Sequence, residues 1–357
     1  MDSMAKIDTL FKMMQQQGAS DLHISTGAPP ILRLHGEMVR VKSPDLTNEQ
    51  AQSLLFEILD EEQIQQFEET RDLDFAYAIP GVARFRGNIL DTHRGIAGVF
   101  RLIPSEILTA EQLNLPEGVL KMTRFNKGLV LVTGPTGSGK STTLAAMIDL
   151  INRTRKEHIL TLEDPLEFVH ENKLSLMNQR QIGTHSDSFA SALKAALRED
   201  PDIILVGEMR DLETIQLAMS AAETGHLVFG TLHTNSAPKT VDRIIDVFPK
   251  DAQEQVRAML SESLKGVVCQ QLLRTADGKG RVAALEIMLG NAAIGNLIRE
   301  GKTFQIPSII QTAKGEGMQL MDAHLMELLN SQKITAEEAH RCAVDKRIFE
   351  AKLTSAE

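Results

Sequence analysis

The residues best suited to chemistry form the stretch Gly134-Pro135-Thr136-Gly137-Ser138-Gly139-Lys140-Ser141-Thr142. An apolar run typical of a buried strand, 128–133, precedes it, and apolar residues at helical spacing, 143–151, follow it. Backbone N–H groups of such a turn can surround a triphosphate, and the helix N-terminus adds partial positive charge. The pattern predicts a phosphate-binding P-loop, in which Lys140 reaches the β- and γ-phosphates and the Ser141 hydroxyl binds Mg²⁺.

Two further apolar runs end in carboxylates, at Glu163 after 158–163 and at Glu208 after 203–207. Acidic groups at the carboxyl ends of strands beside a P-loop strand lie where α/β sheets bind ligands. Glu163 is the better candidate to polarise the attacking water, against the plainer interpretation of a solvated acidic loop. Glu208 stands in a Walker B segment whose usual strand-terminal aspartate is Gly207 here. It is interpreted as a metal-shell residue or as the base, and the sequence does not separate these roles from that of Glu163.

Two histidines, His226 and His233, flank another apolar run. His233 lies among hydroxyl and amide side chains, so it is a candidate for sensing the γ-phosphate and relaying hydrolysis. His226 is a candidate nucleotide ligand, and a half-buried structural histidine explains it equally well.

Four arginines in the first part of the chain, Arg84, Arg86, Arg94 and Arg101, are candidates for contacting phosphate. The spacing of Arg84 and Arg86 places both on one face of a strand. The planar guanidinium matches phosphate oxygens, and an arginine from outside the P-loop domain can stabilise transition-state charge. Taken alone, this set is better explained by ordinary surface ion pairs.

The positioning elements fall into two domains with a linker between them. Residues 1–104 alternate apolar and polar side chains over several short segments and predict a small α+β domain. Residues 105–120 are expected to be the linker, because Pro104 and Pro116 bound a polar stretch with a short helix at 109–113. Residues 121–357 alternate strands and helices, which predicts an α/β fold with a mostly parallel sheet and helices on both faces.

Within these domains the expected elements have the following ranges. Helices are expected at 7–16 and 46–67, and strands at 21–25, 31–36, 72–77, 83–90 and 98–103. Later strands are expected at 129–133, 158–163, 203–207, 227–231 and 282–288, and the chain beyond about residue 292 is expected to be helical.

The amino-acid composition favours a folded globular protein and argues against several other classes. Hydrophobic residues make up 42% of the 357, enough for a folded core, and the net charge is −10. The acidic total, the absence of Trp and the single tyrosine, Tyr77, argue against a nucleic-acid ligand. Cys269 and Cys342 are far apart and are expected to be buried small hydrophobes, not a disulfide or a metal site. The absence of a secretory signal or a membrane-length apolar run predicts a cytoplasmic protein.

With these residues established, the chain closely resembles the PilT-type retraction ATPases of type IV pili, in the secretion-ATPase branch of P-loop motors. The matching runs are 18–23, 81–86, 132–147, 162–165, 198–215 and 222–234, and the resemblance covers nearly the whole chain. It implies a PAS-like N-terminal domain joined to a RecA-like ATPase core with C-terminal helices, assembled as a homohexameric ring.

The resemblance also implies roles and partners. ATP would sit between the two domains, with Mg²⁺, and Arg84, Arg94 and Arg101 would reach the phosphates. Glu163 falls in the acidic "Asp box", Glu208 in Walker B, and His226 and His233 in the His box. The motor would act with the inner-membrane pilus platform, peripheral to the membrane on its cytoplasmic face, and drive pilus retraction and twitching motility.

One position departs from the family pattern. Where the family has Ala-Ile-Arg-Asn-Leu-Ile-Arg-Glu, this chain has Gly295 in place of the first arginine. The replacement removes a charge and costs about 1 kcal/mol of helix propensity. An accessory or paralogous ATPase with altered output and a nucleotide-gated scaffold therefore stay as alternatives. A nucleic-acid motor is a further alternative, because RecA-like rings also include helicases. An extension motor fits less well, because those motors carry a longer N-terminal region and a four-cysteine zinc site.

Overall fold

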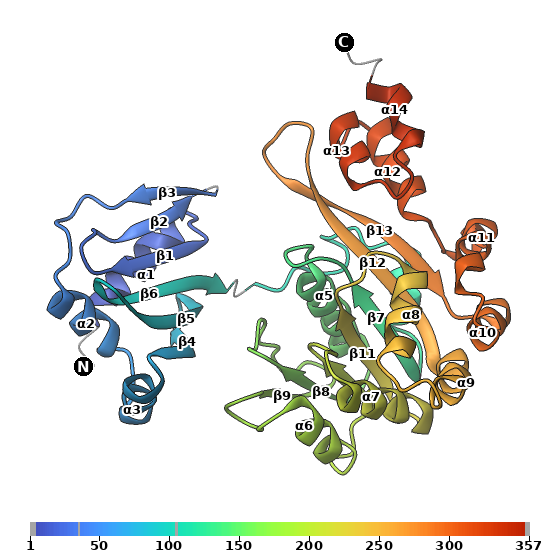
Figure 1. The fold of residues 1–357 in the computed structure, drawn as a ribbon, viewed down its shortest axis with the longest axis horizontal. Helices are drawn as coiled ribbons and strands as arrows, with labels where there is room; N and C mark the ends of the chain where they lie inside the picture. The colour runs from blue at the N-terminus through green and yellow to red at the C-terminus, as the bar shows by residue number, and fades with distance from the viewer. Residues whose placement is uncertain (1–4, 35, 104–105, 354–357) are drawn as a thin grey trace. The chain divides into compact units, whose positions relative to one another are not determined.

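The computed structural model describes residues 5–34, 36–103 and 106–353, and it divides the chain into two compact units, Met1–Glu106 and Ile107–Glu357 (Figure 1). Pro104, the expected start of the linker, lies outside the described residues. None of the described helices is long and apolar enough to cross a membrane.

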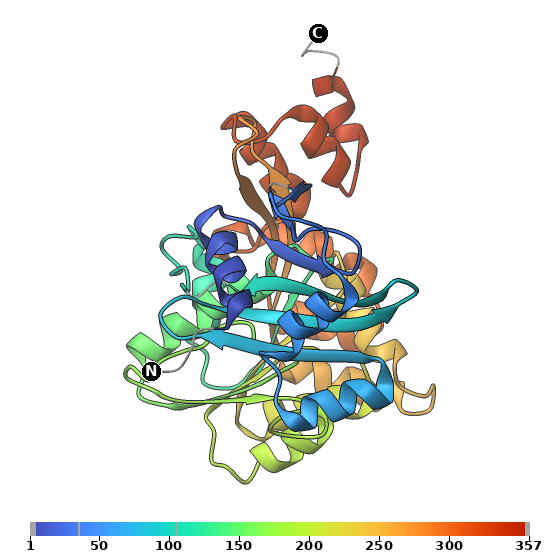
Figure 2. The same cartoon turned by 90° about the vertical axis from the view of Figure 1, so that its left-hand side faces the viewer.

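The N-terminal unit is a six-stranded antiparallel sheet in the order β3-β2-β1-β6-β5-β4. Its elements are α1 Lys6–Gln16, β1 Asp21–Ser25, β2 Ile31–Leu34, β3 Glu37–Arg40, α2 Asn48–Phe56, α3 Glu61–Thr70, β4 Asp72–Ile79, β5 Ala83–Thr92 and β6 Gly95–Ile103. The three helices share one buried apolar cluster with one face of the sheet (Figure 2). Phe11, Phe85 and Phe100 lie at its centre, and the rings of Phe11 and Phe85 stack with centroids 4.2 Å apart.

Two features of this unit differ from the sequence-based expectation. The segment 46–67 forms two helices, because Asp60 accepts a hydrogen bond from the Gln63 N–H and begins a new helix there. The strand β3 was not expected, since all four of its residues are exposed and it lacks a buried apolar side.

The C-terminal unit contains a seven-stranded sheet in the order β13-β12-β7-β11-β10-β8-β9. Its elements are α4 Glu117–Met122, β7 Gly128–Thr133, α5 Lys140–Thr154, β8 His158–Glu163, β9 Leu176–Gln181, α6 Phe189–Ala196, β10 Ile203–Val206, α7 Leu212–Thr224, β11 Leu227–Leu232, α8 Ala237–Asp246, α9 Gln253–Ser263, β12 Leu264–Arg274, β13 Arg281–Leu289, α10 Ala292–Arg299, α11 Ile306–Thr312, α12 Met321–Asn330, α13 Ala336–Cys342 and α14 Arg347–Leu353. Neighbouring strands pair in parallel except β12 and β13, which form an antiparallel hairpin.

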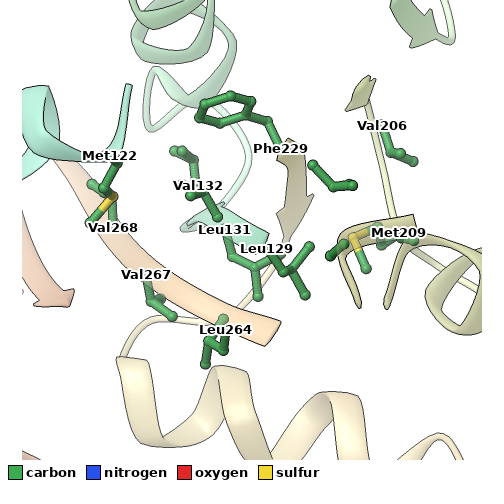
Figure 3. Close-up of a cluster of buried hydrophobic side chains, with 14 of the residues drawn as sticks. Met122, Leu129, Leu131, Val132, Val206, Met209, Phe229, Leu264, Val267 and Val268 are labelled. Atoms are coloured by element: carbon green, nitrogen blue, oxygen red, sulfur yellow. The ribbon is translucent and has the colours of Figure 1, made fainter. Parts of the chain in front are cut away.

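The core of this unit surrounds the strand that leads into the P-loop. Every residue of β7 and β11 is buried, so both faces of the central strands are covered, as the mostly parallel sheet predicted. Figure 3 shows side chains of β7, β10, β11 and β12 packed together, among them Leu131, Phe229 and Val268. This packing gives the loop after β7 a rigid base.

The remaining differences are local. Residues 109–113 form a hydrogen-bonded turn instead of the expected short helix, with the Leu113 N–H bonded to the Thr109 carbonyl. The end of the expected linker belongs to α4, whose Val119 and Met122 are fully buried in the core. The strands β9 and β12 were missed. Beyond residue 292 the chain is helical as expected, and α12–α14 have their own small apolar cluster.

Candidate functional site

The P-loop connects β7 to α5, and its glycines adopt backbone conformations that side chains would strain. Gly137 and Gly139 have φ of 76° and 86°. A Cβ at Gly134 would lie 2.2 Å from the Gln270 carbonyl oxygen, and one at Gly139 would lie 2.8 Å from Gln270 Nε2. Gly134 and Gly139 therefore allow the loop to lie close to β12, and the positive φ angles of Gly137 and Gly139 allow the loop to turn.

The cationic group of the loop is Lys140, the first residue of α5. Its Nζ donates hydrogen bonds to the carbonyl oxygens of Gly134 at 2.9 Å and Pro135 at 3.1 Å, so the side chain spans the loop. Burial lowers the pKa of Lys140, although Glu208 and Glu167 nearby favour its charged form. Ser141 and Thr142 follow on the first turn of α5 and are half-buried.

Glu163 is the last residue of β8; it is half-buried, and its carboxylate accepts several hydrogen bonds. Thr161 Oγ1 donates to Glu163 Oε1 at 2.7 Å, the Glu167 N–H donates to Oε2 at 3.3 Å, and Gln179 Nε2 donates to Oε1 at 3.4 Å. Burial raises the pKa of Glu163, and these hydrogen bonds offset the effect only in part. A carboxylate with a raised pKa is suited to accept a proton near neutral pH.

Glu208 has the opposite electrostatic setting. Arg210 Nε lies 2.5 Å from Glu208 Oε1, and His233 Nε2 donates to the same oxygen at 2.9 Å. Partial burial alone would raise the pKa of Glu208, but the hydrogen bond and charge of Arg210 and the bond from His233 lower it overall. Glu208 is therefore held as an anion, the form that a metal shell requires.

Gly207 explains why this strand carries no aspartate at its end. A Cβ at Gly207 would lie 3.0 Å from the Leu162 carbonyl oxygen and 3.2 Å from the Glu163 Cα. The Gly207 N–H donates to that same Leu162 carbonyl at 2.7 Å. The absence of a side chain lets the ends of β8 and β10 approach closely, and Glu163 and Glu208 lie at these two neighbouring strand ends.

The two histidines lie at opposite ends of β11. In register, Leu232 of β11 is opposite Thr133, the residue before the P-loop, whereas Leu227 is opposite Gly128. His233 thus lies at the P-loop edge of the sheet. His226 lies at the other edge, where its Nδ1 donates to the Ala221 carbonyl at 3.0 Å, so this unit does not bring it to the P-loop.

A hollow next to the P-loop has a volume of about 380 Å³. It is lined by Pro135, His233, Thr234, Asn235, Lys239 and Gln271. Apart from His233 and Pro135 of the P-loop, these residues were not proposed as site residues from the sequence. The hollow contains a lysine, hydroxyl and amide groups, which are suitable neighbours for an anionic ligand.

The candidate arginines belong to the N-terminal unit. Arg86 and Arg101 are paired across β5 and β6, on the sheet face opposite the three helices, and Arg84 shares that face. Arg101 Nε donates to Asp21 Oδ1 at 2.8 Å, yet 72% of its side chain is exposed. Arg94 is exposed in the turn between β5 and β6.

Besides the residues that line the hollow, three residues that contact the site were not proposed from the sequence: Thr161, Gln179 and Gln270. Thr161 and Gln179 surround the Glu163 carboxylate, and Gln270 contacts the P-loop from β12. The apolar run 267–269 was a signal for β12, but nothing local connected it to the P-loop, 132 residues earlier.

The donor set fits Mg²⁺ bound together with a nucleotide. Among the described residues no group of three or more His, Cys, Asp or Glu side chains could hold a metal ion by itself. Mg²⁺ in nucleotide sites is held by one or two protein oxygens, water and the phosphates, so a cage of protein ligands is not required. Ser141 and Glu208 can supply those oxygens.

Known proteins resemble this chain over nearly its full length. The family described as Type II/IV secretion system protein matches residues 3–341. The type IV pilus retraction ATPase PilT of Pseudomonas aeruginosa is 54% identical over 337 residues, covering 94% of this chain and 98% of that protein. A twitching motility protein of Neisseria gonorrhoeae is 54% identical over 314 residues, covering 88% of this chain and 84% of that protein.

A solved structure agrees with these matches. The crystal structure of the pilus retraction motor PilT with bound ADP has a TM-score of 0.91 and 46% identity, covering 98% of this chain and all of that one. The resemblance and the fold class expected from the sequence are therefore confirmed, as is ATP hydrolysis. The chain belongs to the family of Type II/IV secretion system proteins, as an ATPase of the pilus-retraction kind.

Proposed function

We propose that this ATPase is a homohexameric, Mg²⁺-dependent motor whose ATP hydrolysis drives pilin disassembly during type IV pilus retraction. The observation that supports it most is the convergence of the P-loop, Glu163, Glu208 and His233 on one edge of a parallel sheet. Strand ends of this kind are the ligand-binding edge of α/β folds. The sequence similarity to retraction ATPases supports the biological output.

In the proposed site the P-loop backbone and Lys140 bind the phosphates. Residues 134 and 136–142 enclose the triphosphate, and Lys140 exchanges its two carbonyl partners for phosphate oxygens. Ser141 and Glu208 hold the Mg²⁺ shell. The metal, when bound with ATP, neutralises charge on the β- and γ-phosphates.

Glu163 is the proposed base for the attacking water. Its raised pKa makes it the stronger proton acceptor of the two glutamates, while Glu208 stays ionised beside Arg210. His233 orients Glu208 and relays the state of the γ-phosphate through the hydrogen bond between them. His226 lies at the other end of β11 from the P-loop of its own subunit. As a nucleotide ligand it would therefore contact a nucleotide bound to a different subunit of the proposed hexamer.

Arg84, Arg94 and Arg101 are proposed to stabilise the γ-phosphate charge. The guanidinium groups of Arg94 and Arg101 are exposed, and Arg84 is half-buried on the same sheet face as Arg101. Exposed arginines on a separate unit can reach a nucleotide when units close on it. Hydrolysis would drive domain motion about the part of the expected linker that precedes α4, and this motion would transmit force to the inner-membrane pilus platform from its cytoplasmic face.

The first test is phosphate release by the purified protein together with its mass in solution. We expect the wild-type protein to be a hexamer that hydrolyses ATP. We expect Lys140→Ala and Glu163→Gln to abolish this hydrolysis. Turnover at the parent rate in Lys140→Ala would overturn the site assignment. A hexamer that binds ATP without turnover would favour the scaffold or an accessory subunit that needs a partner, and strong stimulation by single-stranded DNA would favour a nucleic-acid motor.

A further inference from the structure

Gln270 is a buried amide on β12 that joins two parts of the P-loop. Its Nε2 donates to the Ser138 carbonyl oxygen at 2.7 Å, and its Oε1 accepts from Thr143 Oγ1 at 2.7 Å. Only 3% of Gln270 is exposed, and Ser138 and Thr143 are equally buried. The carbonyl of Ser138 can only accept, so the orientation of the amide is fixed by its partners.

We infer that Gln270 is a positioning residue that sets the P-loop in its phosphate-binding conformation. This inference rests on the assignment of residues 134–142 as the nucleotide site.

The mechanism follows from the geometry of a peptide group. In a planar trans peptide the carbonyl and the N–H point in opposite directions. Because Gln270 holds the Ser138 carbonyl on the β12 side, the Gly139 N–H must point away from β12, into the loop. Gly139 is also the N-cap of α5, so the same contact orients the first donor of the helix N-terminus.

The second bond fixes the helix relative to the loop. Thr143 lies on the first turn of α5 and gives its hydroxyl proton to Gln270. One side chain thereby sets the distance between the loop backbone at Ser138 and the helix at Thr143. Gly134 and Gly139, where a Cβ would strike Gln270, allow the loop to lie close enough for both bonds.

Loss of the amide should affect binding more than chemistry. In Gln270→Met the buried Ser138 carbonyl has no donor, and the peptide is expected to rotate to find one. We expect Kd for both Mg·ADP and Mg·ATP to rise about tenfold or more, the equivalent of one hydrogen bond, with KM rising in parallel. At saturating ATP, kcat should change by less than about threefold, because the groups on the γ-phosphate and water are intact.

A pH profile separates this role from a general loss of packing. In Gln270→Glu an ionised carboxylate would repel the Ser138 carbonyl, whereas the protonated acid can donate to it. The ratio of variant to wild-type Kd for Mg·ADP should therefore fall as the pH is lowered from about 8 to about 6, since burial raises the pKa of such an acid.

The matched control is Gln319→Met. Gln319 Nε2 donates to the Leu285 carbonyl at 2.8 Å on β13, where Leu285 is paired with Gln270 of β12, so the control tests the loss of a half-buried amide hydrogen bond beside Gln270 that is not made to the P-loop. It should lose comparable thermal stability with an unchanged Kd for Mg·ADP. Calorimetric titration of hexamer with Mg·ADP, alongside thermal unfolding, measures both quantities.

Specific outcomes would overturn the inference or the site assignment on which it rests. Wild-type affinity in Gln270→Met, or equal losses of affinity in Gln270→Met and Gln319→Met, would overturn the inference. A Gln270→Glu ratio that does not vary with pH would also overturn it, and this variant serves if Gln270→Met does not fold. If Lys140→Ala too retains wild-type affinity, the P-loop assignment itself fails; if only Lys140→Ala loses affinity, the failure is confined to Gln270.

Discussion

The imidazole Nε2 of His233 lies 2.9 Å from Oε1 of Glu208, and the same oxygen contacts Arg210. His233 follows β11 and Glu208 follows β10, so this hydrogen bond connects the ends of two neighbouring strands. A change in the position of either side chain therefore alters the hydrogen bonding of the other.

Two substitutions can test whether activity depends on the hydrogen bond that His233 Nε2 donates to Glu208. His233→Leu removes the hydrogen bond to Glu208, and His233→Gln keeps a donor of similar reach. We expect kcat to fall at least about tenfold in His233→Leu and distinctly less in His233→Gln, because a mispositioned catalytic group commonly costs that much. Steady-state ATPase kinetics decide this, and equal losses in both variants would show that the donor is not what matters.

The Arg210 pair predicts a change in acid sensitivity. The folded-state pKa of Glu208 is lowered, so the pair contributes stability above the unfolded value of about 4.5, and this is lost as the pH falls. Arg210→Gln should therefore lower Tm slightly at pH 6 and converge with wild type near pH 3. The effect should be small, since 74% of the Arg210 side chain is exposed.

A remote ion pair supplies the control for Arg210. Arg347 lies 2.7 Å from Asp345 and is also exposed, at 82%. Arg347→Gln should show a similar loss of Tm with unchanged ATPase activity, whereas Arg210→Gln should change activity. Identical activity in both variants would argue against a role for Arg210 at Glu208.

Glu163→Gln should separate binding from hydrolysis and change the pH dependence of stability. Loss of the proton acceptor should lower kcat by about 100-fold or more while Mg·ADP still binds. The folded-state pKa of Glu163 is raised, so the folded protein holds the extra proton and loses stability as the pH rises above about 4.5. The Tm of Glu163→Gln minus that of wild type should therefore grow between pH 5 and pH 8. A constant difference would contradict the raised pKa.

The sequence could predict the parts of the fold whose signals are local. The strand 158–163 was expected with the bounds that β8 has, because a strand buried on both faces is a continuous apolar run. The P-loop was evident from its glycines and their strand–helix context. His233 and Glu208 could be proposed because each directly follows such a run.

The parts that were missed depend on partners far away in the chain. The edge strand β9 has one buried residue, Met177, among exposed and half-buried residues such as Leu176 and Gln179, so it does not resemble a buried strand. Gln270 is polar within an apolar strand, and only its contact with Ser138 explains it. The pairing of Glu208 with Arg210 and the burial of Glu163 give these two glutamates different electrostatics, which spacing alone could not show.

Gly295 poses a test in which helix propensity and packing predict opposite results. It lies within α10, where alanine would be favoured over glycine by about 1 kcal/mol. A Cβ there would, however, lie 2.9 Å from the carbonyl oxygen of Ser261, at the end of α9. The contacting atom belongs to the backbone of α9 and cannot rotate away as a side chain could. The helices α9 and α10 would therefore have to move apart, and overpacking of this kind costs about 1–3 kcal/mol.

We therefore expect Gly295→Ala to lower Tm and Gly315→Ala to leave it unchanged or raise it. Gly315 has no atom within 4 Å of an added Cβ and no positive φ, so the main effect there is the lower conformational entropy of the unfolded chain, which stabilises the folded protein. Gly295→Arg, which introduces the arginine of the family pattern, carries the same Cβ and should cost at least as much unless α10 moves away from α9. Thermal unfolding of the three variants measures this, and a rise in Tm for Gly295→Ala would show that the contact with Ser261 is relaxed at little cost.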